Sequence, residues 1–171
     1  MLQQAAMKLV WLAMFAALVV SCTESESDEE GGGSVADSRC ASGTRWAGGD
    51  AESPLMHPGA DCIGCHSSGE GPSFVIAGTV QAALDDPTDC YGVPGATVTV
   101  TDATGKTVSV LTNDAGNFYV SARDAMTMPI QARVAFDGRE RAMAGAQMTG
   151  ACASCHTTSG ANGAPGRILV P

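Results

Sequence analysis

The sequence predicts a mainly β protein: a small antiparallel sandwich flanked by two short segments of a different character. Three observations support this fold class. Between positions 74 and 147, short stretches rich in Val and Thr alternate along the chain with a period of two. Turn-forming residues separate these stretches. The chain is also rich in Gly, with 21 residues, and only 16% of it is charged, which suits a turn-rich domain better than a helical bundle.

The expected strands follow one another with short connections. The dipeptide Asp137-Gly138 is a strong two-residue turn signal and indicates that the last two strands form a hairpin. Asn113-Asp114-Ala115-Gly116 is a further turn signal between two strands. The expected strands, in chain order, are Phe74–Gln81, Ala96–Asp102, Thr107–Thr112, Asn117–Val120, Pro129–Phe136 and Glu140–Gln147.

Three runs within residues 74–147 carry a family resemblance. They are Ala77-Gly78-Thr79-Val80, Gly92-Val93-Pro94-Gly95-Ala96-Thr97-Val98 and Thr112-Asn113-Asp114-Ala115-Gly116-Asn117-Phe118. This stretch resembles the carboxypeptidase regulatory-like family, which has a transthyretin-like fold. The resemblance implies a structural scaffold that has no active site of its own.

The amino terminus resembles an export signal. In residues 1–21, a single Lys8 precedes an apolar run from Leu9 to Val20, which is too short to span a bilayer comfortably. A short uncleaved membrane anchor is the alternative. The run ends in Val19-Val20-Ser21-Cys22, which resembles the lipobox of bacterial lipoproteins. That resemblance implies that Cys22 is lipidated and anchors the protein in the bacterial cell envelope, on the periplasmic face, with the outer membrane favoured.

Residues 22–38 are predicted to form a tether between this anchor and the folded domain. They carry Asp and Glu together with a run of Gly, and they contain no basic residue. Like charges and Gly cannot bury apolar surface, so we expect a flexible, self-repelling segment.

Two motifs flank the predicted sandwich, in residues 39–73 and 148–171. They are Cys62-Ile63-Gly64-Cys65-His66 and Cys152-Ala153-Ser154-Cys155-His156. Cys-x-x-Cys-His is the attachment signature of c-type haem, in which two thiols form thioethers and the next His binds the iron. One helical turn places both sulfur atoms at one edge of the macrocycle. We therefore expect two covalently attached c-type haems, held by Cys62, Cys65, Cys152 and Cys155, with His66 and His156 as iron ligands.

Three other interpretations of these Cys pairs stay open. A thioredoxin-type redox pair needs a βαβ context that the sequence does not offer. A zinc site made by both pairs requires an unusually long separation, since Cys65 and Cys152 are 87 residues apart. Plain disulfides are the third option. None of the three explains why His follows both pairs when the chain contains only three His.

Cys40 and Cys90 remain after the motifs and Cys22 are assigned. In an oxidising compartment two leftover thiols most often pair. A Cys40–Cys90 disulfide would account for all seven Cys of the chain.

The sixth ligand of each iron is ambiguous in the sequence. His57 is the only His outside the motifs, and Met residues of the mature chain are the other candidates. Met56 and His57 precede the first motif closely, and Met148 lies just before the second. We take His57, Met56 and Met148 as the candidate metal ligands; the remaining Met residues, Met126, Met128 and Met143, are also available.

These features predict a membrane-anchored dihaem cytochrome that carries electrons between redox partner proteins and is not an enzyme. A net charge of −9 excludes nucleic acid as a partner, because a polyanion is repelled by phosphate backbones. One alternative is a lipid-anchored binding module without haem, in which the Cys pairs form disulfides or hold zinc. Another is a small haem enzyme such as a peroxidase.

Overall fold

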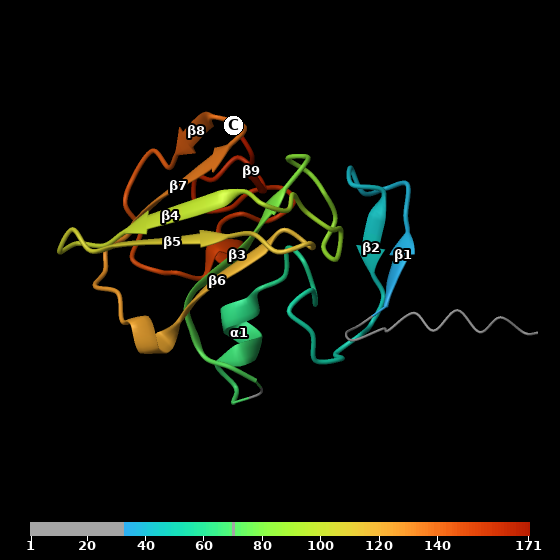
Figure 1. Cartoon of the computed structure of the whole chain (residues 1–171), viewed down its shortest axis with the longest axis horizontal. Helices are drawn as coiled ribbons and strands as arrows, with labels where there is room; N and C mark the ends of the chain where they lie inside the picture. Colours follow the sequence, from blue (N-terminus) through green and yellow to red (C-terminus); the bar gives the residue numbers. More distant parts are fainter. Residues whose placement is uncertain (1–32, 70) are drawn as a thin grey trace, which may run out of the picture.

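The computed structural model describes residues 33–69 and 71–171, and within them the protein is mainly β. The predicted signal peptide and Cys22 lie outside the described residues. No helix in the described part of the chain is long and apolar enough to cross a membrane. The helical elements are α1 (Cys62–His66) and the 3₁₀ turns η1 (Ala122–Asp124) and η2 (Cys152–Ser154). The strands in Figure 1 are β1 (Ser34–Ala36), β2 (Thr44–Trp46), β3 (Phe74–Gln81), β4 (Thr97–Thr101), β5 (Thr107–Leu111), β6 (Asn117–Ser121), β7 (Gln131–Phe136), β8 (Arg139–Ala142) and β9 (Ile168–Leu169).

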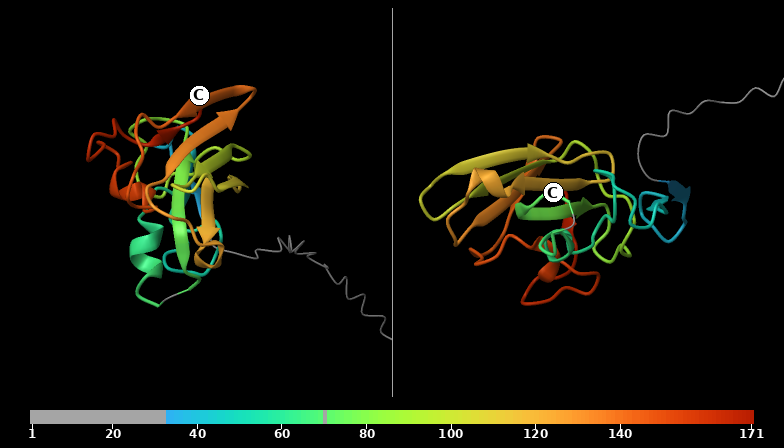
Figure 2. Two further views of the ribbon diagram at one scale, coloured as in Figure 1. Left: turned by 90° about the vertical axis from the view of Figure 1, so that its left-hand side faces the viewer. Right: turned by 90° about the horizontal axis from the view of Figure 1, so that it is seen from below.

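Two sheets lie against each other and enclose the core. One has the strand order β6-β3-β9 and the other the order β5-β4-β7-β8, and Figure 2 shows the two layers from the side. Burial of a large aliphatic or aromatic side chain contributes about 1.5–3 kcal/mol, so the shared cluster accounts for much of the cohesion between the layers. The cluster consists of Ile76, Val80, Phe118 and Val120 from the first sheet, and Ala96, Val98, Val100, Ile130 and Val134 from the second sheet and the residues that lead into it.

The predicted mainly β, antiparallel character is confirmed. Strands β3 and β6 pair antiparallel, as do β4 with β5, β4 with β7, and β7 with β8. The predicted hairpin turn has φ 48° at Asp137 and 72° at Gly138. Two adjacent residues with positive φ give the turn twist that fits a tight antiparallel hairpin. The local turn chemistry therefore defines this part of the sheet.

Two features differ from the sequence expectation at the carboxyl end. Strand β8 ends at Ala142 instead of Gln147, because the small residues and Gly145 that follow have low β propensity. Strand β9 pairs with β3 in parallel, through Val80 with Ile168 and Gln81 with Leu169. The layered domain therefore does not end at residue 147. A two-residue strand that pairs with a distant partner leaves no periodic signal in the sequence.

A hairpin of β1 and β2 stands beside the two layers (Figure 1). Strand β1 falls in the segment predicted to be a flexible tether, so that prediction does not hold for residues 34–36. The hairpin is joined to the loop that precedes β4: the Trp46 amide donates to the Asp89 carbonyl at 2.8 Å, and the Tyr91 amide donates to the Thr44 carbonyl at 2.9 Å. Trp46 itself is buried, with 1% of its surface exposed.

The predicted disulfide between Cys40 and Cys90 is confirmed. Both residues are buried, and they are 50 positions apart in the sequence. The bond therefore closes a long loop that includes the first Cys-x-x-Cys-His motif and strand β3.

We predict that the double variant Cys40→Ala/Cys90→Ala is less stable by about 3–4 kcal/mol, since a cross-link over a loop of this length restricts the unfolded chain. Urea denaturation followed by tryptophan fluorescence measures the change, with Ser42→Ala as a matched surface control. An unchanged midpoint in the double variant would show that the hydrogen bonds of β2 hold the hairpin without the disulfide.

Candidate functional site

Both Cys-x-x-Cys-His motifs lie against strand β3. Helix α1 contacts β3, and so does η2. The residues before η2 run beside the strand: Ala151 pairs with Ala77 in parallel, and the Ala77 amide donates to the Gly150 carbonyl at 3.0 Å. Figure 2 shows α1 and the carboxyl-terminal segment on the same side of β3. A fold with consecutive antiparallel strands thus brings together two motifs that are far apart in the sequence.

The first motif forms a single helical turn. The Asp61 carboxylate caps the turn by accepting a hydrogen bond from the Gly64 amide at 3.1 Å. Asp is one of the residue types preferred at a helix N-cap. The turn places Cys62 and Cys65 one helical turn apart, as thioether attachment requires. Burial raises the pKa of the Cys62 thiol.

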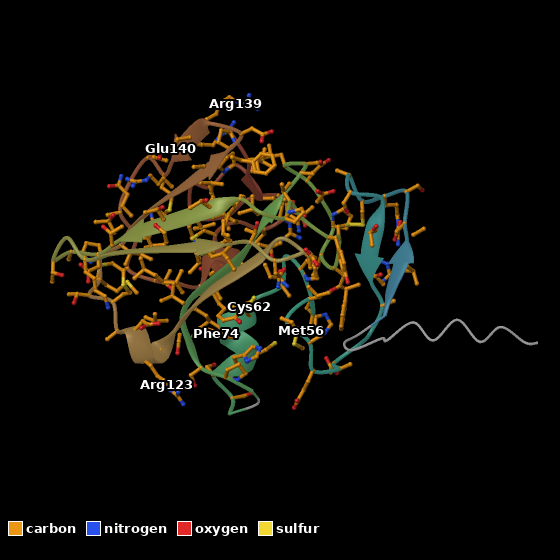
Figure 3. The ribbon with its side chains drawn as sticks, viewed as in Figure 1. Met56, Cys62, Phe74, Arg123, Arg139 and Glu140 are labelled. Atoms are coloured by element: carbon orange, nitrogen blue, oxygen red, sulfur yellow. A yellow bond between two sulfur atoms is a disulfide. The ribbon has the colours of Figure 1, made fainter. Side chains whose placement is uncertain are left out.

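An aromatic row begins at the His of the first motif. The His66 ring centroid is 4.8 Å from that of Phe74, and the Phe74 centroid is 4.6 Å from that of Tyr119. Figure 3 labels Phe74 and Cys62 in this region. The Nδ1 atom of His66 is buried and has no hydrogen-bond partner among the described residues. The outer end of the row is open to solvent, with Tyr119 48% exposed.

Cys152 of the second motif packs against the hydrophobic cluster. Cys152 lies against Gly78 of β3, where an added Cβ would be 2.8 Å from the Cys152 Cβ and 3.1 Å from the Phe118 ring. Only Gly permits this approach of Cys152 to the strand. Burial is the main cause that raises the pKa of the Cys152 thiol to about 12, and the nearby Cys62 adds to it.

The His of the second motif is held in one orientation. His156 Nδ1 is 2.9 Å from the Gly166 carbonyl oxygen. Because a carbonyl oxygen only accepts, Nδ1 must carry the proton, which leaves Nε2 with a free lone pair. This is the arrangement that orients a metal-binding His and raises its basicity.

A cavity of about 370 Å³ opens between the second motif and the four-stranded sheet. Its volume falls in the range typical of sites for small molecules and cofactors, about 300–1,000 Å³. One wall contains all three reactive residues of the motif, Cys152, Cys155 and His156. The opposite wall is mostly apolar and includes Ile76, Val98, Val100, Phe118, Ile130 and Val134. The donor set and the apolar wall fit a covalently attached haem.

The guanidinium of Arg167 connects the two motif segments. Its hydrogen bonds go to the carbonyls of Gly59 (2.7 Å), Asp86 (2.9 Å) and His156 (3.4 Å). They also go to the hydroxyls of Thr88 and Thr158, both at 3.1 Å. All five donors of the fork are thus used, although the residue is only 4% exposed. Sequence reasoning missed this residue, yet a signal exists. After Arg141 the sequence contains no Asp, Glu, Lys or Arg other than Arg167.

The three predicted sixth ligands lie outside the cavity. His57 Nδ1 is 2.9 Å from an Asp89 carboxylate oxygen, and His57 Nε2 is 3.4 Å from one of Asp50. Met148 is 73% exposed, whereas Met56 is half-buried and its carbonyl accepts from the Asn117 amide at 3.0 Å. None of them lines the cavity at the second motif. Iron ligation by these residues stays a prediction.

The four Cys of the motifs are unpaired in the structure, whereas Cys40 and Cys90 form a disulfide. Within residues 33–69 and 71–171, no group of three or more His, Cys, Asp and Glu side chains is placed to hold a metal ion.

Comparisons with protein-family models, curated proteins and solved structures gave no match to this chain. The resemblances to bacterial lipoproteins and to the carboxypeptidase regulatory-like family therefore stay predictions from the sequence.

We predict that Arg167→Gln lowers the free energy of unfolding by on the order of 3 kcal/mol, because several buried acceptors lose their partner. Urea denaturation measures the change. Arg123→Gln is the matched control: Arg123 extends outward from η1 and its side chain is exposed (Figure 3). Equal stabilities of the two variants would contradict a connecting role for Arg167.

Proposed function

We propose that this protein is a lipid-anchored dihaem c-type cytochrome that carries electrons at the periplasmic face of a bacterial envelope. The observation that carries the proposal is the apolar cavity that the second Cys-x-x-Cys-His motif lines with all three of its reactive residues. The repetition of the same motif on α1 supports two such sites.

Each residue of the second motif has a defined role in this proposal. Cys152 and Cys155 would form the thioethers, and His156 would bind the iron through Nε2, since its Nδ1 is held by the Gly166 carbonyl. The apolar wall excludes water from the buried face of the site. A bound haem supplies a one-electron iron couple whose potential depends on the axial ligands and the surrounding polarity.

The shared contact with β3 supports electron exchange between the two sites. Helix α1 and η2 both touch this strand. A rigid strand that both motifs contact would keep the distance between the haems fixed. The domain would then act as a scaffold for two cofactors, in line with the transthyretin-like sandwich that the sequence resembles.

The partners in this proposal are redox proteins, which the sequence does not name. A net charge of −9 favours partners with basic docking surfaces and disfavours nucleic acid. The amino-terminal lipid would hold the protein at the membrane, with the acidic tether as a spacer.

We expect intact-mass analysis to find two covalent haems in protein made with a haem-attachment system. Cys62→Ala/Cys65→Ala and Cys152→Ala/Cys155→Ala should each carry one, because each pair of thiols holds one macrocycle. Ser154→Ala, which changes a middle residue of the second motif, is the matched control and should keep both. Wild-type protein without covalent haem would refute the proposed function. Two haems in either double variant would refute the assignment of that motif.

Replacement of the lipidated residue tests the anchor separately. Cys22→Ser should move the protein from the membrane fraction to the soluble periplasmic fraction, because acyl chains supply most of the anchoring energy. Immunoblots of fractionated cells measure this, with Ser27→Ala in the tether as the control. A Cys22→Ser protein that stays with the membranes after a salt wash would contradict lipid anchoring.

A further inference from the structure

The inner face of the four-stranded sheet extends past the core into the cavity at the second motif. Val134 pairs with Arg141, and the Met143 amide donates to the Ala132 carbonyl at 2.9 Å, which continues the same register. Residues directly opposite each other in an antiparallel pair project to the same face. Val134 is a buried core residue, so Arg141 and Met143 lie on the inner face, and both line the cavity.

The Met residues of the described chain differ in their surroundings. Met126 and Met128 are packed against the hydrophobic cluster, and Met148 is largely exposed. Met143 is half-buried, is not part of that cluster, and lines the cavity that His156 also lines. A Met in a core usually fills space, but the Met143 side chain borders open volume.

Among the described residues that line this cavity, Met143 is also the one side chain that can bind haem iron and has no role assigned to it. His, Met, Cys and Tyr are the side chains that bind haem iron. Among the described residues that line the cavity, this set comprises Cys152, Cys155, His156 and Met143. The two Cys are assigned to thioethers and His156 to the first axial position, which leaves Met143 for the second.

The charged side chains beside the cavity also favour a haem as its occupant. Arg133 also lines the cavity, but it forms an ion pair with Glu140 at 3.1 Å. Arg141 has no ion pair within the described part of the chain. A free cation at the edge of an apolar cavity suits an apolar macrocycle that carries carboxylate groups at its rim.

We propose that Met143 is the sixth ligand of the iron held by the second motif, with Arg141 as the partner of the carboxylates of that haem. This inference rests on the proposed function, since it assigns residues to one of its two haems. It replaces Met148 with Met143 at the second site and makes no statement about the first site.

The test compares Met143→Leu with Met148→Leu, two substitutions of similar size. Met143→Leu should keep both covalent haems but convert one from low-spin to high-spin in the electron paramagnetic resonance spectrum of the oxidised protein. Its reduced form should bind one more carbon monoxide per chain than the wild type. One of the two midpoint potentials should fall, because Met ligation raises the potential. Met148→Leu should match the wild type in all three measurements.

A second variant separates ligation from packing. Met143→His should carry two haems, remain low-spin and show a lowered potential at one haem, because imidazole replaces the thioether. Arg141→Gln should shift the same potential, whereas Arg139→Gln, on a neighbouring position of β8 outside the cavity, should not.

Each outcome discriminates between the two proposals. Two covalent haems with wild-type spectra and potentials in Met143→Leu would overturn the Met143 assignment and leave the proposed function intact. The same follows if Met148→Leu, and not Met143→Leu, becomes high-spin. Wild-type protein without covalent haem would overturn both.

Discussion

The hydrogen bonds of the buried Arg167 guanidinium are the interactions on which the arrangement of the two motif segments depends. They join three loops that no strand pairing connects: the segment before the first motif, the loop that follows β3, and the second motif itself. Desolvation lowers the pKa of Arg167, and the nearby Asp86 opposes this shift. The Asp86 carboxylate in turn accepts from the Ala41 amide at 2.8 Å, next to the disulfide. One cation therefore connects the amino-terminal hairpin with both motifs.

Strand β3 supplies the second constraint, because its two faces serve different purposes. On the inner face, Gly78 omits a side chain and leaves room for Cys152 between the sheets. On the other face, the Thr79 hydroxyl accepts from the Gly59 amide at 2.7 Å and donates to the Asn117 side chain at 2.7 Å. The same strand thus fixes the loop before α1 and admits the second motif into the core. A slip of one residue in its register would exchange these two faces and remove both contacts.

The sequence predicts the local structure and the Cys40–Cys90 disulfide well in this chain and long-range contacts poorly. The turn at Asp137-Gly138 was predictable because a dipeptide determines it. The Cys40–Cys90 bond followed from counting, since the motifs and the lipobox account for the other Cys. Strand β9 and the contacts of Arg167 were not predictable, because each depends on residues about 80 positions away. The proposed sixth ligand illustrates the same limit: Met148 is closer to Cys152 in sequence, but the register of β7 and β8 brings Met143 to the cavity.

Under the proposed function, the two haem sites are not equivalent. They differ in the groups that contact the two iron-binding His side chains. His156 has its Nδ1 proton held by a carbonyl, and it lines a cavity that Met143 also lines. His66 has no such partner among the described residues, and its ring begins an aromatic row that ends at the exposed Tyr119. A hydrogen bond to the ligating imidazole and the polarity around the iron both tune the potential. The first site therefore meets the surface where a partner protein can approach, and the second faces a mostly apolar cavity. With both sites in contact with β3, this asymmetry is what a carrier needs to accept an electron at one site and hold it at the other.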